Sequence, residues 1–356
     1  MHEGVRWRGP AVALAAATLA AAVALSGGST ADPPVPRGFP GPIPSFLTGP
    51  SADGAERRWL ARAESLGAEA PIWAQRLYVR SLLVLRAATD QRTGAVVAGA
   101  PAGWAYVWPR DAGAVAIALA AAGYRPEARR IARFLLRLDL DAAARFYSNG
   151  EPVDGREAQG DAGGWVTVAA RAAGVTATRA SRWRKRADYQ EKEPGDYLGN
   201  AIAAGVDSLR IREAFAFGEG LGRRANEPSS GLDTVAAWAV RPFPRPALVP
   251  AARQTLLRLA AQGGRFGLLP SEDWDGGEDP WTAPTTWTAW SLAALGERRA
   301  ALKLMAALRR AATRRGLLPE RVDAQTGAPR STTPLAWSHA FTVLALRELW
   351  PRRPPG

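Results

Sequence analysis

Hydrophobic positions recur at helical spacing along most of the chain, and they define two kinds of helix. In one kind, at residues 126–138 and 301–312, apolar side chains occupy one face and arginines the other. In the other kind, at residues 82–88, 112–122 and 287–295, apolar side chains occur on every face. A helix that is apolar all round is buried on all sides. The pattern predicts roughly ten to twelve helices between residues 51 and 350.

Alternation of amphipathic and fully buried helices predicts two concentric rings of helices, which is an all-α toroid. A solenoid of helix pairs is the competing arrangement, but no sequence repeat at a period of roughly 34–47 residues is visible. Two helix boundaries are also predicted. Gly316 is expected to end the helix at 301–312, and Thr333 is expected to cap a helix whose first residue is Pro334.

The joins between the predicted helices are long and rich in Gly, Pro, Trp, Asp and Glu. They comprise residues 99–110, 148–161, 187–195, 271–286 and 317–333. Long polar loops on a rigid scaffold are where functional residues usually lie. The sequence therefore predicts one site that is assembled from several joins.

Residues 1–31 resemble a signal peptide. Arg6 and Arg8 precede an apolar stretch at residues 11–25, and small residues allow cleavage after Ala31. The stretch is short beside the roughly 20 apolar residues of a membrane-spanning helix. We expect a secreted, extracellular protein, or one tethered outside the membrane if this segment remains as an N-terminal anchor.

The chain around the helical domain is predicted to be extended. Residues 32–50 contain seven prolines and are expected to form a linker, and residues 351–356 form a tail. Residues 51–350 are then the single helical domain.

Composition restricts the chemistry that the protein can perform. The 356 residues include no Cys and two His, which excludes disulfides, thiol catalysis and a three-histidine metal site. His339 is expected to be a packed residue inside a helix. The net charge is +13, but the only basic run beside an aromatic residue is 182–186, so no nucleic-acid partner is predicted. Carboxylates, arginines and 14 tryptophans remain.

Five motifs allow both a structural and a functional interpretation. The structural interpretations are a helix cap, solvated acidic loops, a surface ion pair, a tryptophan that fills the core, and a turn. The functional interpretations are sugar-binding charge pairs, catalytic carboxylates and an aromatic platform for a sugar ring. The motifs lie at residues 106–111, 154–161, 187–193, 279–282 and 317–321, and the second of them ends at Asp161.

Taken together, the order and spacing of these motifs resemble glycoside hydrolase family 15, the group of glucoamylases, glucodextranases and bacterial trehalases. The resemblance runs from residue 75 to residue 346. It rests on Tyr106-Val107-Trp108-Pro109-Arg110-Asp111, Asp154-Gly155-Arg156-Glu157, Asp188-Tyr189-Gln190-Glu191, Asp279-Pro280-Trp281, Leu318-Pro319-Glu320 and Thr333-Pro334-Leu335-Ala336-Trp337-Ser338-His339.

The resemblance implies an (α/α)6 barrel without a separate β-sandwich domain, and hydrolysis of terminal α-linked glucose with inversion. It implies that Glu191 is the general acid and Glu320 the general base. The implied reaction needs no metal and no cofactor. The residues expected to hold the carbohydrate substrate, an α-glucoside, are Trp108, Arg110, Asp111, Asp154, Arg156, Trp281 and Trp337.

This chemistry needs one protonated and one ionised carboxyl group. Burial or the nearby Glu193 is expected to raise the pKa of the acid, whereas Arg321 is expected to favour the ionised base. Gln190 and Lys192 depart from the residues common in the family at the acid motif, and Arg321 departs at the base.

Two alternatives therefore stay open. One is a degenerate relative that binds glycan or cell-envelope polysaccharide without hydrolysis, and the other is a basic module that binds anionic polymers. Maltodextrin, isomaltose-type dextran and trehalose all fit a pocket for one terminal sugar.

Overall fold

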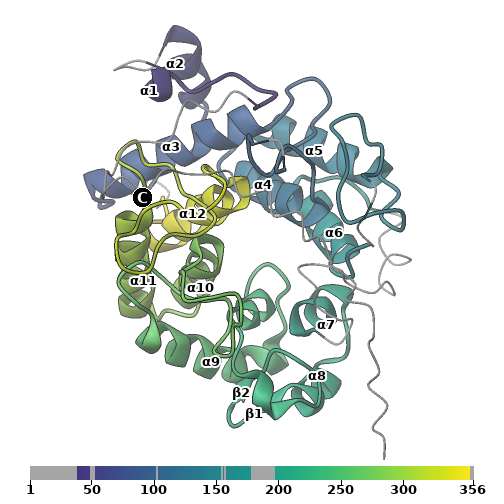
Figure 1. Ribbon diagram of the computed structural model, residues 1–356. Helices are drawn as coiled ribbons and strands as arrows, with labels where there is room; N and C mark the ends of the chain where they lie inside the picture. Colours follow the sequence, from purple (N-terminus) through teal and green to yellow (C-terminus); the bar gives the residue numbers. More distant parts are fainter. Residues whose placement is uncertain are drawn as a thin grey trace, which may run out of the picture.

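The computed structural model describes residues 38–48, 53–101, 103–153, 155, 158–177 and 197–352. Within these residues the structure is mostly helical, and its helices follow one another around a ring (Figure 1). The α-helices are α1 (Ser45–Thr48), α2 (Gly54–Leu60), α3 (Ile72–Ala88), α4 (Pro109–Ala121), α5 (Arg125–Arg137), α6 (Ala162–Ala172), α7 (Leu198–Ala204), α8 (Ser208–Ala214), α9 (Val249–Gln262), α10 (Thr282–Ala294), α11 (Arg298–Ala311) and α12 (Ala336–Leu349).

Short elements fill the stretch between α8 and α9. Strands β1 (Ala216–Phe217) and β2 (Gly220–Leu221) form a two-residue antiparallel hairpin. The 3-10 helices are η3 (Pro228–Ser230), η4 (Thr234–Ala239) and η5 (Pro246–Leu248). Of these, η4 is buried throughout and packs against α7, α9 and α10.

Helices α4, α10 and α12 form the inside of the molecule. Nearly all of their side chains are buried, as the apolar runs at 112–122 and 287–295 predict. Helix α12 packs against α3, α4 and α10, and α4 packs against α6, so the inner helices contact one another directly. Small residues such as Ala112, Ala116 and Ala289 allow this close packing.

Helices α5 and α11 lie outside the inner helices. Each buries one apolar stripe, against α4 and α10 respectively, while its arginines face solvent. The predicted two kinds of helix are thus both present, and the boundaries at 126–138 agree with α5 to within one residue.

One predicted helix start is wrong. Helix α12 begins at Ala336 after Leu335, and the Thr333 hydroxyl donates to the Ser331 carbonyl instead of capping a helix. The reason is that the neighbouring amides have distant partners: Leu335 N donates to Leu318 O, and Ala336 N donates to Ala98 O. Likewise α11 ends at Ala311, five residues before Gly316.

Part of the predicted linker packs on the helical domain. Phe39 and Leu47 are buried, and Gly41 N donates to Ala87 O. The expected extended tether therefore does not describe residues 38–48, because their few apolar side chains find a groove beside α3. Residues 1–31, the predicted signal peptide, lie outside the described residues. Among those described, no helix is long and apolar enough to cross a membrane.

Candidate active site

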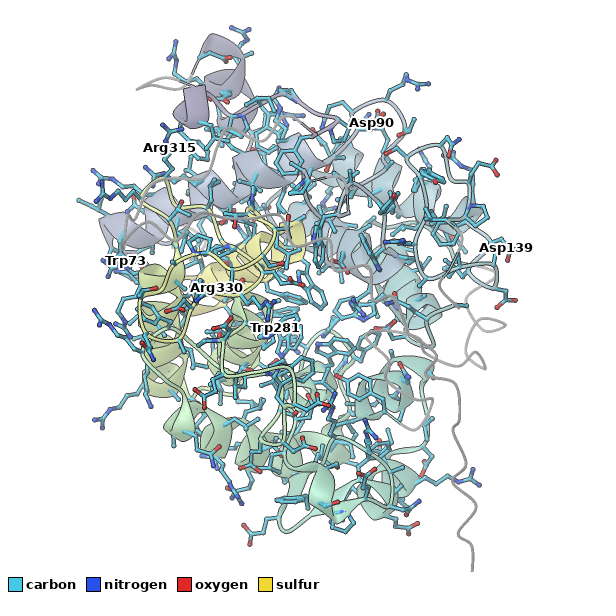
Figure 2. All side chains as sticks on the ribbon, in the orientation of Figure 1. Trp73, Asp90, Asp139, Trp281, Arg315 and Arg330 are labelled. Carbon is cyan, nitrogen blue, oxygen red and sulfur yellow. The ribbon has the colours of Figure 1, made fainter. Side chains whose placement is uncertain are left out.

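The N-terminal ends of α4, α6, α10 and α12 meet at one place. Arg110 at the start of α4 contacts Asp161, which precedes α6, and Trp337 at the start of α12. Trp281 precedes α10 and lies on the side of that helix that faces the centre of the ring (Figure 2). Four of the five predicted long joins lead into this region. The structure thereby brings Arg110 into contact with Trp337, 227 positions later in the sequence.

Arg110 is the central charge of this region. Its side chain is about 5% exposed, with Nη2 3.4 Å from Asp111 Oδ2 and Nη1 3.4 Å from Asp161 Oδ2. The guanidinium lies over the Trp337 ring, 4.5 Å from its centroid. Since a buried charge is costly unless it is paired, two carboxylates and an aromatic face hold this cation in one orientation.

Asp161 belongs to the motif at residues 154–161, and its structural interpretation as a turn and cap residue does not hold for the side chain. Its side chain makes no capping hydrogen bond to α6 and pairs with Arg110 instead. Burial raises the pKa of the Asp161 carboxyl, and the charge of Arg110 opposes that rise. Asp111, in the first turn of α4, pairs with the same guanidinium.

Glu320 lies on a loop that is clamped on both sides. Its backbone N–H donates to Thr332 O (2.9 Å), and its carbonyl accepts from Thr282 N at the start of α10 (2.9 Å). The carboxylate is nearly buried, and the Ser331 hydroxyl donates to its Oε2. This loop therefore fixes one carboxylate rigidly beside Trp281.

His339 is hydrogen-bonded to the same loop. It is fully buried, its Nε2 accepts from Leu318 N (3.0 Å), and its Nδ1 lies 2.9 Å from the Ser81 hydroxyl. Because Nε2 is an acceptor, the ring proton is on Nδ1 and is donated to Ser81. Burial lowers the pKa of His339 to about 3. The expectation of a packed, hydrogen-bonded histidine inside a helix is confirmed.

Arg321 pairs with a carboxylate on a neighbouring segment. Its guanidinium lies 4.0 Å from the Asp279 carboxylate, across the bridge that joins Trp281 and Arg321. Arg321 thus ties the Glu320 loop to the segment that carries Trp281.

A narrow cavity opens beside Trp281 and Trp337. It is lined also by Arg223, Asp233, Trp274 and Trp287. Trp287 contacts Trp337 edge-on with ring centroids 5.2 Å apart, and Trp274 contacts Trp281 in the same way at 5.4 Å. Trp281 and Trp337 are therefore cavity walls, as the sequence analysis expects.

Arg223, Asp233 and Trp274 were missed by the sequence analysis. Arg223 and Asp233 are buried, with Arg223 Nε 4.0 Å from Asp233 Oδ2. Burial raises the pKa of Asp233 to about 7, although the hydrogen bond from Val235 N and the charge of Arg223 both lower it. Only Trp274 carried a usable signal, since it lies within the predicted functional join at 271–286.

The remaining predicted site residues divide into two groups. Trp108 is buried at the start of α4, 5.8 Å from the Trp104 ring and within 6.1 Å of Tyr106. Glu191, Asp154 and Arg156 lie outside the described residues. Among the residues that are described, no group of three or more His, Asp or Glu could hold a metal ion.

A family comparison and a structural comparison point in the same direction. The model of glycosyl hydrolases family 15 matches residues 73–147, which include Trp108, Arg110 and Asp111. A search of the curated proteins finds no match.

Several solved structures share this fold at low sequence identity. A structure described as a wild-type glycosidase is 20% identical, with a TM-score of 0.65, and the match covers 84% of this chain and 99% of that chain. A bacterial glucoamylase complexed with acarbose is 17% identical, with a TM-score of 0.68 over 82% of this chain and 57% of that chain. The glucoamylase from Saccharomycopsis fibuligera is 12% identical, with a TM-score of 0.63 over 80% of this chain and 97% of that chain.

These likenesses show that the protein has the fold of solved glycosidases and glucoamylases. The family model adds a sequence match that covers the motif around Arg110 and Asp111. The resemblance to glycoside hydrolase family 15 is therefore confirmed, through the family signature at residues 73–147 and the glucoamylase-like fold of most of the chain.

Proposed function

We propose that this protein is an exported, inverting exo-glycosidase that hydrolyses terminal α-linked glucose from oligosaccharides or polysaccharides. The helices complete an (α/α)6 barrel, and the site lies at the N-terminal ends of its inner helices. The observation that carries the proposal is the rigidly held Glu320 carboxylate on a loop that is hydrogen-bonded to the start of α10, directly after Trp281, which lines the tryptophan-rich cavity.

Glu320 has the features that a general base needs. Its backbone is fixed on both sides, and the Ser331 hydroxyl donates to its carboxylate, which holds the carboxylate in place. Base catalysis requires the carboxylate to remove a proton from water as that water attacks the anomeric carbon. Glu320 is nearly buried, so few other solvent molecules compete for it.

Arg110 and Asp111 are proposed to hold the terminal sugar. A guanidinium donates to hydroxyls and a carboxylate accepts from them, so the pair suits a ring with several adjacent hydroxyls. Trp337 supports Arg110 from one side, and Trp108 begins the same helix. Homologous folds support a carbohydrate ligand, because one solved relative is complexed with acarbose and another with glucose.

Glu191 is proposed as the general acid that protonates the leaving oxygen. In an inverting enzyme the two carboxyl groups stand about 6.5–9.5 Å apart, so that one water molecule fits between the base and the sugar. Asp154 and Arg156 are proposed as further substrate contacts. Export is proposed from residues 1–31, whose sequence resembles a signal peptide.

The test is a substrate panel of maltotriose, panose, isomaltotriose and trehalose, with released glucose measured for the unaltered protein, Glu191→Gln and Glu320→Gln. We expect glucose from at least one substrate and its loss in both variants. No product from any of them, together with sugar-induced changes in tryptophan fluorescence, would favour the alternative of a glycan-binding relative without hydrolysis.

A further inference from the structure

One wall of the cavity has no role in the chemistry proposed above. It consists of Arg223, Asp233 and Trp274, which line the cavity. Together with Asp273, which pairs with Arg223, these residues will be called the Arg223 wall. Its residues come from the segment after β2 and from the segment before α10, far from Arg110 in the sequence. This wall shares the cavity with Trp281 and Trp337, so whatever occupies the cavity meets both.

The backbone of the Arg223 wall is fixed by long-range hydrogen bonds. Arg223 N donates to Gly231 O, and Arg223 O accepts from Leu198 N, each at 3.0 Å. Asp233 forms an isolated bridge with Ser271, three residues before Trp274. Arg223 and Trp274 are therefore held beside each other by the fold.

The side chains of the wall contact one another in a fixed order. The Arg223 guanidinium lies over the Trp274 ring, 5.1 Å from its centroid. Its Nε is 4.0 Å from Asp233 Oδ2, and its Nη1 is 3.9 Å from Asp273 Oδ1. Cation–π attraction and two carboxylates thus set the orientation of both the guanidinium and the indole.

The indole N–H of Trp274 has no hydrogen-bond acceptor among the described residues. This Nε1–H is buried, and the same holds for Trp281 Nε1–H, which also lacks a partner among the described residues. A buried N–H normally has a partner, and one that lacks it calls for an explanation. Trp274 and Trp281 both line the cavity.

We propose that Trp274 is a specificity-determining residue whose indole N–H donates to one hydroxyl of the bound sugar, and that Arg223 is the positioning residue that orients this indole. The inference rests on the proposed function, because it places a sugar in the cavity. It extends that function by a second hydrogen-bonding wall, in addition to Arg110 and Asp111.

The test measures binding of D-glucose and its 2-, 3-, 4- and 6-monodeoxy analogues to the full chain by ligand-observed NMR titration. Trp274→Phe keeps an aromatic ring beside Arg223 and removes the N–H donor together with the rest of the five-membered ring, so the comparison among the deoxy sugars separates the lost hydrogen bond from the lost contact area. We expect glucose to bind about threefold to tenfold more weakly, as for the loss of one neutral hydrogen bond. For one deoxy sugar the loss should vanish, which names the accepting hydroxyl.

Trp59→Phe is the matched control. Trp59 also has a buried indole N–H without a partner among the described residues, but it stacks on Tyr124 and does not line the cavity. It should leave glucose binding unchanged. Arg223→Gln should weaken glucose binding as much as Trp274→Phe does, and Arg223→Lys should restore part of it, because a lysine also places a cation over the ring.

The proposal is overturned if Trp274→Phe binds glucose and all four deoxy sugars with the affinity of the unaltered protein. It is also overturned if the unaltered protein shows no saturable glucose binding. Glucose binding needs no catalysis, so the two proposals fail separately. Hydrolysis that persists in Glu320→Gln contradicts the proposed function alone, whereas unchanged binding in Trp274→Phe contradicts the second wall alone.

Discussion

Replacing His339 tests whether a buried neutral histidine holds the loop that carries Glu320. Burial lowers the pKa of His339 to about 3 in the folded protein, whereas an unfolded histidine has a pKa near 6.5. The unfolded state therefore takes up a proton first as the pH falls. His339 contributes stability that is fully present above pH 6.5 and is lost progressively between pH 6.5 and pH 3.

The size of this effect follows from the two pKa values. Between pH 7 and pH 5, protonation of His339 in the unfolded state lowers the free energy of unfolding by about 2 kcal/mol. His339→Gln removes the titration while its amide oxygen can still accept from Leu318 N. The variant should lose about 2 kcal/mol less than the unaltered protein over this pH interval.

The assay is urea unfolding at pH 7 and pH 5, followed by tryptophan fluorescence. Asp233, whose pKa is about 7, titrates in both proteins and cancels in the comparison. His2→Gln is the matched control, since His2 is the other histidine of the chain, and it should behave as the unaltered protein. Equal losses for the unaltered protein and His339→Gln would refute the reasoning.

Two further predictions concern the buried charges of the site. Burial keeps the pKa of Asp233 at about 7, well above that of an unfolded aspartate, so this carboxyl destabilises the fold as the pH rises from 4 to 7. Asp233→Asn should raise the free energy of unfolding by about 2–3 kcal/mol more at pH 8 than at pH 5, measured by urea unfolding, and an equal effect at both pH values would contradict this. Arg110→Met leaves Asp111 and Asp161 without their shared guanidinium and should cost about 3–5 kcal/mol of stability. Arg258→Met, which breaks a largely exposed pair with Glu272, should cost about 0–1 kcal/mol in the same assay, and equal costs would show that Arg110 is not a buried ion-pair partner.

Local periodicity predicts the helices well, because each pattern reports which face is buried. The amphipathic stretch at 126–138 corresponds to α5, and the apolar runs at 112–122 and 287–295 lie within or close to α4 and α10. Helix ends were predicted less well. The amides of Leu335 and Ala336 bond to distant segments, so the start of α12 depends on tertiary contacts.

The sequence singles out residues of the candidate site where consecutive residues form one motif. Arg110 with Asp111, and Glu320 after Leu318-Pro319, are of this kind. In the sequence Asp161 resembles a helix cap, because an aspartate that caps a helix and an aspartate that pairs with a distant arginine can have the same neighbouring residues. Its role depends on Arg110, 51 residues away.

The Arg223 wall could not be predicted from the sequence. Arg223 is one of many arginines, and nothing in its neighbourhood distinguishes a buried arginine from an exposed one. It contacts Asp233, Asp273 and Trp274, which come from two other segments of the chain.

The most direct test of the central claim is the anomeric form of the first product. Proton NMR, recorded within minutes of adding the substrate that is turned over, distinguishes β-glucose from α-glucose before they equilibrate. The account predicts that the unaltered protein releases β-glucose and that Glu320→Gln releases none. Initial release of α-glucose, or undiminished turnover by Glu320→Gln, would contradict an inverting mechanism in which Glu320 is the base.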